Sequence, residues 1–390
     1  MRSTMNRALS ERKPGRLYSS SILKAARLFW TASADISSTA LADELRASPD
    51  ISAIGLVDAE GRALGIVRRE QLFGMLSKPF GREILGKMPA SELMEDFPSF
   101  DAHEGLFTVA NALLGDDPDH APEFSLLVDE DSYFQGVLSA RDLSAYLATM
   151  TREDIDLAGS LQERLLSSNE LARGDDWSIG AWSRAARGVG GDFWFTKSMD
   201  DGRVFLALCD VSGKGVAASL VVAMAWGMLK TYDLSLGLVP LIKGLNEALI
   251  ASFHLEKYLT GFFAIYDPIS RVLELADMGH SHALVFRGAK ARKPILGQAN
   301  LPVGIEPTLE PGLVRWRMKA GDRLLIYSDG FTEQENSAGK ELGEKRLALI
   351  AAKALASGER LEEALALAFD RYRGKTPQQD DVTMLSLSLR

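Results

Sequence analysis

The sequence predicts an α+β protein, with a C-terminal domain of antiparallel sheets covered by helices in α-β-β-α layers. A smaller α/β pair and a helical connector are expected to precede this domain. Three observations lead to this prediction. A pattern of residues recurs once in the first part of the chain, displaced by 71 positions. A long stretch without proline follows it, and beyond residue 177 short apolar runs alternate with turns.

The repeat lies within residues 20–150, which we expect to form one domain of two similar modules. Leu56-Val57-Asp58 recurs as Leu127-Val128-Asp129, and Gly65-Ile66-Val67 recurs as Gly136-Val137-Leu138. Each copy predicts an apolar strand, a polar turn, a second short strand and a helix. Two modules with equivalent apolar faces are expected to pack together.

Residues 151–176 are predicted to connect this pair to the C-terminal domain. They continue a helix predicted from Asp142 to Glu170, and Asp175-Asp176 ends the connector. The apolar residues of this helix fall near the spacing of a coiled-coil seam, which polar Asp154 interrupts: Leu143, Leu147, Met150, Leu157, Leu161 and Leu165. Such a seam either packs within the chain or joins two chains as a homodimer, and the sequence leaves both open.

The C-terminal domain is predicted over residues 177–390. Short turns between most of its apolar runs favour antiparallel sheets, with the helices on the outer faces. The predicted strands are Val204–Val211, Gly261–Tyr266, Val272–Ala276, Leu284–Phe286, Leu324–Tyr327 and Val382–Leu389, and the predicted helices are Val216–Thr231, Pro240–Phe253 and Leu342–Tyr372.

Composition excludes several classes of protein. The net charge of −9 argues against nucleic acid as a partner, because such binding depends on Lys and Arg neutralising phosphates. The single cysteine, Cys209, excludes an internal disulfide and is either a packed strand residue or a reactive thiol. The longest apolar run, Val216 to Leu229, is shorter than a membrane span. Residues 1–19 are predicted to be a flexible N-terminus without a secretory signal, so we expect a cytoplasmic protein without membrane contact.

Acidic residues gather at glycine-flanked turns of the C-terminal domain. Glycine lets the backbone approach an ion closely, and carboxylates are the ligands that hard divalent cations prefer. The pattern therefore predicts metal-dependent phosphate chemistry. The segments are Gly190-Gly191-Asp192-Phe193, Asp210-Val211-Ser212-Gly213-Lys214-Gly215, Gly279-His280, Tyr327-Ser328-Asp329-Gly330 and Asp380-Asp381-Val382-Thr383.

The first domain resembles a tandem cystathionine-β-synthase (CBS) domain pair. In that family the pattern Gly-apolar-apolar-Ser/Thr-x-x-Asp binds adenosine nucleotides, and residues 136–142 match it in full. The resemblance implies that Ser139 serves the phosphate and Asp142 the ribose of an adenine nucleotide. Asp142 capping the following helix is the alternative. The first copy has Arg68 and Gln71 at these positions, so at most one nucleotide site is expected.

The region from about Leu161 to the C-terminus resembles the SpoIIE-type (RsbU-like) branch of the metal-dependent type 2C Ser/Thr protein phosphatases. Ten motifs that carry the resemblance occur in family order: Gln162-x-x-Leu165-Leu166, Val189-Gly-Gly-Asp192-Phe, Asp210-Val-Ser-Gly-Lys-Gly-Val-Ala-Ala, Leu245-Asn246, Gly279-His280, Pro302-x-Gly304, Gly321-Asp322, Tyr327-Ser-Asp329-Gly, Thr332-Glu333 and Asp380-Asp-Val-Thr383.

The resemblance implies a centre of two Mn²⁺ or Mg²⁺ ions. Asp210 would bridge them, Asp192 and the backbone carbonyl of Val211 would hold one ion, and Asp329 and Asp380 the other. Two such ions can lower the pKa of a shared water, orient phosphate oxygens and stabilise an in-line displacement, so catalysis needs no side-chain nucleophile.

The sequence leaves several roles open. Asp381 is expected to support the metal ligands or the Thr383 turn, with Asp380 as the ligand. Lys214 is expected to screen the acidic cluster. His280 is either a proton donor or a structural hydrogen-bonding residue. Arg184 and Arg187 are candidates for binding phosphate, or else lie exposed to solvent. Phe195 and Gly188 stand where the family often has Asp and Glu, which affects metal affinity and ion number.

The predicted function is metal-dependent hydrolysis of phosphoserine or phosphothreonine on a regulatory partner protein, under control of the CBS-like pair. By resemblance, the substrate would be a phosphorylated anti-sigma-factor antagonist in a bacterial partner-switching pathway. The alternative is a non-catalytic protein on the same fold that senses nucleotides or binds a partner. Loss of the ligand carboxylates would favour this alternative, but all four are present.

Overall fold

The computed structural model describes residues 8–12, 21–114, 122–167, 171–288, 290–294 and 300–390. It divides into two compact units, Met1–Arg152 and Glu153–Arg390. Most of the predicted flexible terminus, residues 1–19, lies outside the described residues. Within it, Leu9–Glu11 forms a short strand that pairs with Trp30–Ala32, which differs from the prediction.

The first unit contains the predicted repeat as two βαββ arrangements, each followed by a helix. In each copy the first strand pairs in parallel with the second, and the second and third form an antiparallel hairpin with a bulge. The first copy consists of β2 (Trp30–Ser33), α1 (Ser38–Ala47), β3 (Ala53–Val57), β4 (Ala63–Arg68) and α2 (Arg69–Leu76); the second consists of β5 (Ser99–Asp101), α4 (Leu106–Leu114), β6 (Phe124–Val128), β7 (Phe134–Ser139) and α5 (Ala140–Ser167). Strand β1 (Leu9–Glu11), helix α3 (Gly81–Ile84) and the short 3-10 helices η1 (Ile22–Lys24) and η2 (Ala90–Leu93) complete the unit.

The two copies pack together, as the repeat predicts. One buried cluster draws Ala53 and Ile66 from the first copy, and Phe124, Phe134 and Val137 from the second. The contact is close, because a Cβ atom added at Gly55 would overlap the ring of Phe134.

Helix α5 contains the boundary between the units, and its apolar residues do not form one continuous seam. Leu143 is buried in the first unit, where Leu147 and Met150 pack against the same cluster. In the second unit Leu157 and Leu161 are exposed at 57% and 54%. The N-terminal part of the predicted seam is therefore a packing face within the chain, whereas Leu157 and Leu161 are open to solvent in the chain alone.

The second unit is built from two five-stranded sheets in which every pair of neighbouring strands is antiparallel. The first sheet has the order β15 (Val314–Arg317), β12 (Val272–Met278), β11 (Leu259–Asp267), β10 (Val204–Val211) and β9 (Asp192–Ser198). The second has the order β14 (Lys290–Arg292), β13 (Ala283–Arg287), β16 (Asp322–Tyr327), β17 (Val382–Leu389) and β8 (Trp177–Arg184).

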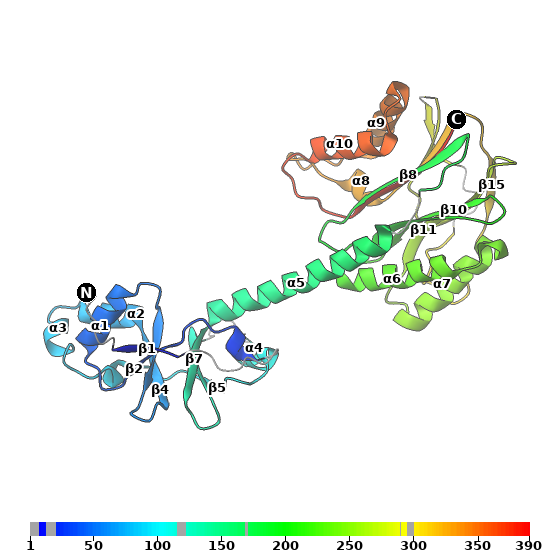
Figure 1. Ribbon diagram of the computed structural model, residues 1–390. Coiled ribbons are helices and arrows are strands. Elements are labelled where there is room, and N and C mark those ends of the chain that lie inside the picture. Colours follow the sequence, from blue (N-terminus) through cyan, green and yellow to red (C-terminus); the bar gives the residue numbers. More distant parts are fainter. Residues whose placement is uncertain (1–7, 13–20, 115–121, 168–170, 289, 295–299) are drawn as a thin grey trace. The chain divides into compact units, whose positions relative to one another are not determined.

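Helices cover the outer faces of both sheets, which gives the predicted α-β-β-α layers (Figure 1). Helices α6 (Val216–Thr231) and α7 (Leu238–Phe253), joined through η4 (Leu234–Leu236), pack on the first sheet. Helices α9 (Glu344–Ser357) and α10 (Leu361–Arg373) pack on the second, with the short α8 (Asp329–Glu333) between β16 and α9. The contacts of α6 and α7 with the first sheet form one core, and those of α9 and α10 with the second sheet form another. A third core fills the space between the sheets.

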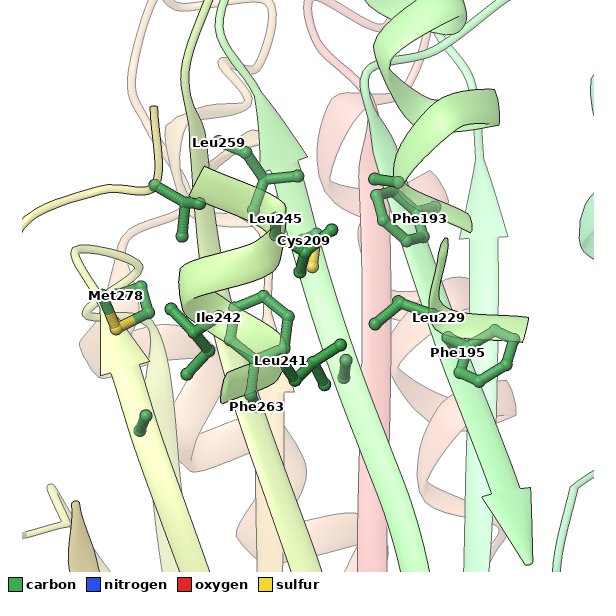
Figure 2. Close-up of a cluster of buried hydrophobic side chains, with 14 of the residues drawn as sticks. Phe193, Phe195, Cys209, Leu229, Leu241, Ile242, Leu245, Leu259, Phe263 and Met278 are labelled. Atoms are coloured by element: carbon green, nitrogen blue, oxygen red, sulfur yellow. The ribbon is translucent and has the colours of Figure 1, made fainter. Parts of the chain in front are cut away.

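Strand β10 contributes to two of these cores, because alternate side chains point to opposite faces of a sheet. Phe205 and Cys209 face α6 and α7, and Leu206 and Leu208 face the other sheet. Figure 2 shows Cys209 among the aromatic and aliphatic side chains of the core between the first sheet and helices α6 and α7. Burial raises the pKa of the Cys209 thiol well above its ordinary value, so the packed strand residue, not the reactive thiol, is the alternative that the structure supports.

The predicted helix Leu342–Tyr372 is wrong as a single element. It is interrupted at Gly358, which adopts a left-handed conformation with φ of 73° and ends α9. Strands β8, β9, β14 and β15 were not predicted. Among the described residues, no helix combines the length and apolar character needed to span a bilayer.

Candidate metal centre

Asp192 and Asp210 lie opposite each other on neighbouring strands. Asp210 is the penultimate residue of β10, and Asp192 is the first residue of β9, directly after Gly190-Gly191. The antiparallel register pairs the two residues, which brings their side chains to the same face of the sheet edge. The strand arrangement therefore assembles one pair of the predicted ligands.

Asp329 and Asp380 come from the other sheet. Asp329 opens α8 two residues beyond the end of β16, and Asp380 lies two residues before β17. Ser328 joins these segments, since its N–H donates to the Thr383 carbonyl at 2.9 Å and its Oγ accepts from the Thr383 N–H at 2.9 Å. A Cβ atom at Gly330 would overlap the Asp381 carbonyl oxygen, so glycine is needed there. Asp210 lies near the C-terminal end of a strand, Asp192 and Asp329 are the first residues of their elements, and Asp380 precedes β17.

These carboxylates affect one another's ionisation. The pKa of Asp210 is raised to about 7, first by burial and then by the negative charges of Asp329, Asp380 and Asp381. The pKa of Asp192 is raised well above its ordinary value by burial and by the charge of Asp210, against a hydrogen bond from Ser328. Divalent cations would relieve both effects, because an opposite charge favours the ionised form.

The donor atoms fit hydrated Mg²⁺ or Mn²⁺ ions. Asp192 Oδ2 is buried and has no hydrogen-bond partner among the described residues, an arrangement that is costly unless another group binds there. The Val211 carbonyl faces Gly191, where an added Cβ would lie 3.0 Å from it. No three His, Cys, Asp or Glu side chains in the described chain are placed to hold one ion together. Mg²⁺ commonly keeps several waters beside one or two carboxylates, so the pairs present suffice.

Lys214 contacts the centre as predicted. Its Nζ lies 2.6 Å from Asp380 Oδ2, and it also donates to the Gln379 carbonyl at 3.3 Å. The ammonium group therefore compensates part of the negative charge at Asp380.

Asp381 supports the turn that carries Asp192. Its Oδ1 accepts from the Ala186 N–H at 2.8 Å, and its Oδ2 accepts from the Gly191 N–H at 2.6 Å. Both oxygens are thus engaged by backbone donors, which agrees with the prediction of a supporting role. Asp380 is the more exposed of the two; its Oδ1 accepts from the Asp381 N–H at 2.9 Å, and its Oδ2 lies beside Lys214.

Gln162 of α5 holds the same turn from the other side. Its Nε2 donates to the Gly190 carbonyl at 2.7 Å, and its Oε1 accepts from the Gly190 N–H at 3.0 Å. The amide pairs with Gly190 as a neighbouring strand would. The sequence motif contained Gln162, but its contact with a residue 28 positions away could not be seen from the motif alone.

His280 is a structural residue. Its ring is buried, Nε2 lies 3.0 Å from the Tyr327 carbonyl, and burial lowers its pKa to about 3. A ring that stays neutral at physiological pH and is directed at a backbone carbonyl is unsuited to donate a proton to a leaving group. Asp277, which sequence reasoning missed, fixes this turn by accepting from the N–H groups of His280 and Ser281.

The suggested phosphate ligand Arg184 is bound elsewhere. Its guanidinium donates to Asp370 and Gln378 and lies over the rings of Trp182 and Phe369. Gln378 in turn donates to the Asp380 carbonyl at 2.8 Å, so this group orders the loop before β17. Arg187 is exposed.

Ser139 and Asp142 bind each other in the first unit. The Ser139 hydroxyl donates to Asp142 Oδ2 at 2.7 Å and accepts from the Asp142 N–H at 3.0 Å. Ser139 therefore caps α5, and Asp142 completes the cap in the third helical position. In the first copy Arg68 forms ion pairs with Glu95 and Glu123, as expected for a position without nucleotide-binding groups.

Comparison with known proteins relates the second unit to a phosphatase family. Residues 200–390 match the family Stage II sporulation protein E (SpoIIE). This SpoIIE-like region begins within the turn between β9 and β10 and includes Asp210, Asp329 and Asp380.

Two curated relatives and one solved structure agree with the match. Phosphoserine phosphatase RsbU of Bacillus subtilis is 25% identical over 190 residues, which are 48% of this chain and 56% of the relative. Stage II sporulation protein E of Priestia megaterium is 30% identical over 156 residues, which are 39% of this chain and 26% of the relative. The SiaA-PP2C domain of Pseudomonas aeruginosa superposes with a TM-score of 0.53 at 19% identity, covering 63% of this chain and 99% of that domain. The chain thus spans about half or less of the curated relatives' length, and the second unit has a PP2C-type fold.

Proposed function

We propose that the second unit is a metal-dependent phosphatase that hydrolyses phosphoserine or phosphothreonine on a partner protein. The observation that carries the proposal is the pair Asp192 and Asp210, opposed on neighbouring strands, with a buried Asp192 oxygen that has no partner in the described chain. Similarity to phosphoserine phosphatase RsbU supports the reaction class.

The chain's own residues would hold and order the centre. Asp210 would bridge two ions, with Asp192 and the Val211 carbonyl on one side and Asp329 and Asp380 on the other. Bound Mn²⁺ or Mg²⁺ supplies a nucleophilic water at neutral pH and positive charge for the phosphate oxygens. Asp381 and Gln162 keep the Asp192 turn in place, and Ser328 fixes the start of α8 against β17.

The test is phosphate release from a phosphoserine peptide by the full chain, with Mn²⁺, Mg²⁺ or chelator. Asp210→Asn should lower turnover by about 100-fold or more while the fold persists, because it removes a charge that both ions need. Asp201→Asn is the matched control, since Asp201 lies in an exposed turn beside Arg203. Near-normal, metal-stimulated turnover by folded Asp210→Asn would refute the assignment.

For the first unit we propose a regulatory role as a CBS-like pair, supported by its repeated βαββ arrangement. Binding of an adenine nucleotide at Ser139 and Asp142 would have to break their mutual hydrogen bonds. Calorimetry with AMP and ATP tests this site, which should bind at most one nucleotide per chain and more weakly in Asp142→Ala. If no nucleotide binds at millimolar concentration, the CBS-like pair would be regarded as a module for assembly and not for nucleotide sensing.

For the partner we propose a phosphorylated anti-sigma-factor antagonist, and for the assembly a homodimer in the cytoplasm. The first rests on the similarity to RsbU, and the second on the exposed leucines of α5. Phosphate release from a panel of phosphorylated antagonist proteins tests the partner.

A further inference from the structure

A basic cavity lies at the edge of the second unit, away from the candidate metal centre. It has a volume of about 590 Å³, and none of the predicted metal ligands lines it. This volume falls within the range of small-molecule sites in proteins. The lining residues are Leu275, Val285, Arg287, Lys290, Arg292, Lys293, Pro294, Val314, Arg315 and Trp316.

The register of the edge strands explains why cations gather there. In the β13–β14 hairpin Val285 pairs with Arg292, and Arg287 pairs with Lys290, which places all four side chains on one face. Facing residues come from the edge of the other sheet, where Val314 pairs with Leu275. The cavity thus lies between the inner faces of the sheets, where their outermost strands leave the core.

Its floor is apolar. Leu275 and Val285 belong to the core between the sheets, and Val314 and Trp316 pack against that core while remaining partly exposed. Within the described residues, strand β15 pairs only with β12 and β14 only with β13, so both are edge strands at the opening.

The charged side chains that line the cavity are all positive. The lining includes five cationic side chains and no acidic one, in a chain whose net charge is −9. Arg287, Lys293 and Arg315 form ion pairs with Asp322, Glu344 and Glu274. In the described part of the chain, Lys290 and Arg292 have no carboxylate within ion-pair distance. Like charges placed opposite each other in a sheet repel, and a bound anion would relieve that repulsion.

We propose that this cavity binds a small amphipathic anion, with an aromatic or aliphatic body against Trp316 and a carboxylate, sulfonate or phosphate group against Lys290 and Arg292. The apolar floor would bury the body, and the two cations would hold the head group. This site is separate from the proposed phosphatase centre and does not depend on it.

The probe for the test is 8-anilinonaphthalene-1-sulfonate, titrated by fluorescence against the full chain in chelator. Saturable binding at one site per chain is expected. Lys290→Glu/Arg292→Glu should weaken it tenfold or more, and Trp316→Ala should weaken it as well. The control is Lys345→Glu/Lys353→Glu, which makes the same change in charge on exposed positions of α9 and should leave the affinity within about twofold.

Three further measurements test which chemical feature of the probe the cavity recognises. The uncharged analogue N-phenyl-1-naphthylamine should bind at least tenfold more weakly, and equal binding would overturn anion recognition. Lys290→Gln/Arg292→Gln keeps the test valid if charge reversal disturbs the fold, and unchanged affinity in this folded variant would place the probe elsewhere. Binding to phosphatidylglycerol vesicles without binding of the monomeric probe would replace the small-molecule site with a membrane surface. Absence of saturable binding would refute the proposal.

Discussion

Asp210→Asn is expected to stabilise the metal-free second unit even though it removes the proposed activity. The Asp210 carboxyl is buried beside other acidic groups, and its pKa is raised from 3.8 to about 7. Ionisation of this group therefore disfavours the folded state when no cation is present. Asparagine keeps the size of the side chain and removes that charge.

The size of the effect follows from the difference in pKa. Well below pH 3.8 the carboxyl is protonated in both the folded and the unfolded state, so it does not lower the free energy of unfolding. As the pH rises from 3.8 to about 7, the unfolded chain ionises first and the free energy of unfolding falls by about 1.4 kcal/mol per pH unit. Above pH 7 the carboxyl is ionised in both states, and the free energy of unfolding falls no further on its account. The substitution should therefore change the stability little at pH 4 and raise it by about 4 kcal/mol at pH 8.

Urea unfolding in chelator, followed by tryptophan fluorescence, measures this difference. Trp30 is the one tryptophan of the first unit, and the other five of the six lie in the second. Asp201→Asn is the control with the opposite sign, because Arg203 lowers the pKa of Asp201. A stability difference between Asp210→Asn and the native chain that is absent at pH 8, or does not grow between pH 4 and pH 8, would refute this account of the site.

Three other outcomes are expected. Gln162→Ala should weaken Mn²⁺ binding measured by calorimetry about tenfold, because it frees the turn before Asp192, and an unchanged affinity would show that the Gln162 contact is dispensable. Leu157→Asn/Leu161→Asn should shift a dimer towards monomer in sedimentation, since these leucines are exposed in the single chain, and an unchanged oligomeric state would exclude them from the interface. The pH dependence of turnover should show no transition assignable to His280, whose pKa lies at about 3, so a His280→Gln variant that folds should keep the same pH profile.

Regular apolar patterns were sufficient to predict much of the fold. The bounds of β10, β17 and α6 agree with their predicted ranges, because each segment is predominantly apolar and follows a glycine or polar turn. Strand β8 escaped prediction because glycine and serine alternate with its buried residues. The break between α9 and α10 depends on the single glycine Gly358.

The candidate site was predictable as a set of carboxylates but not as an arrangement. Motif order pointed to Asp192 and Asp210, and only the register of β9 and β10 shows that they face each other. The amide of Gln162 and the carboxylate of Asp277 act through contacts with backbone atoms, which no residue pattern specifies. Likewise, Ser139 and Asp142 fit a nucleotide motif and a helix cap equally well in sequence, and the structure shows the cap.

The contact between Gln162 and Gly190 bears on where a catalytic fragment of this protein can begin. A fragment cut at Trp177, where the sequence places the domain boundary, would keep both sheets and all four candidate carboxylates. It would lack the end of α5, and with it both hydrogen bonds to the turn before Asp192. Leu166, which packs on the core under α6 and α7, would also be lost. A fragment that begins at Glu153 retains these contacts. The 24 residues from Glu153 to Asp176 therefore decide whether a fragment has an ordered metal site, or only the folded sheets that carry its ligands.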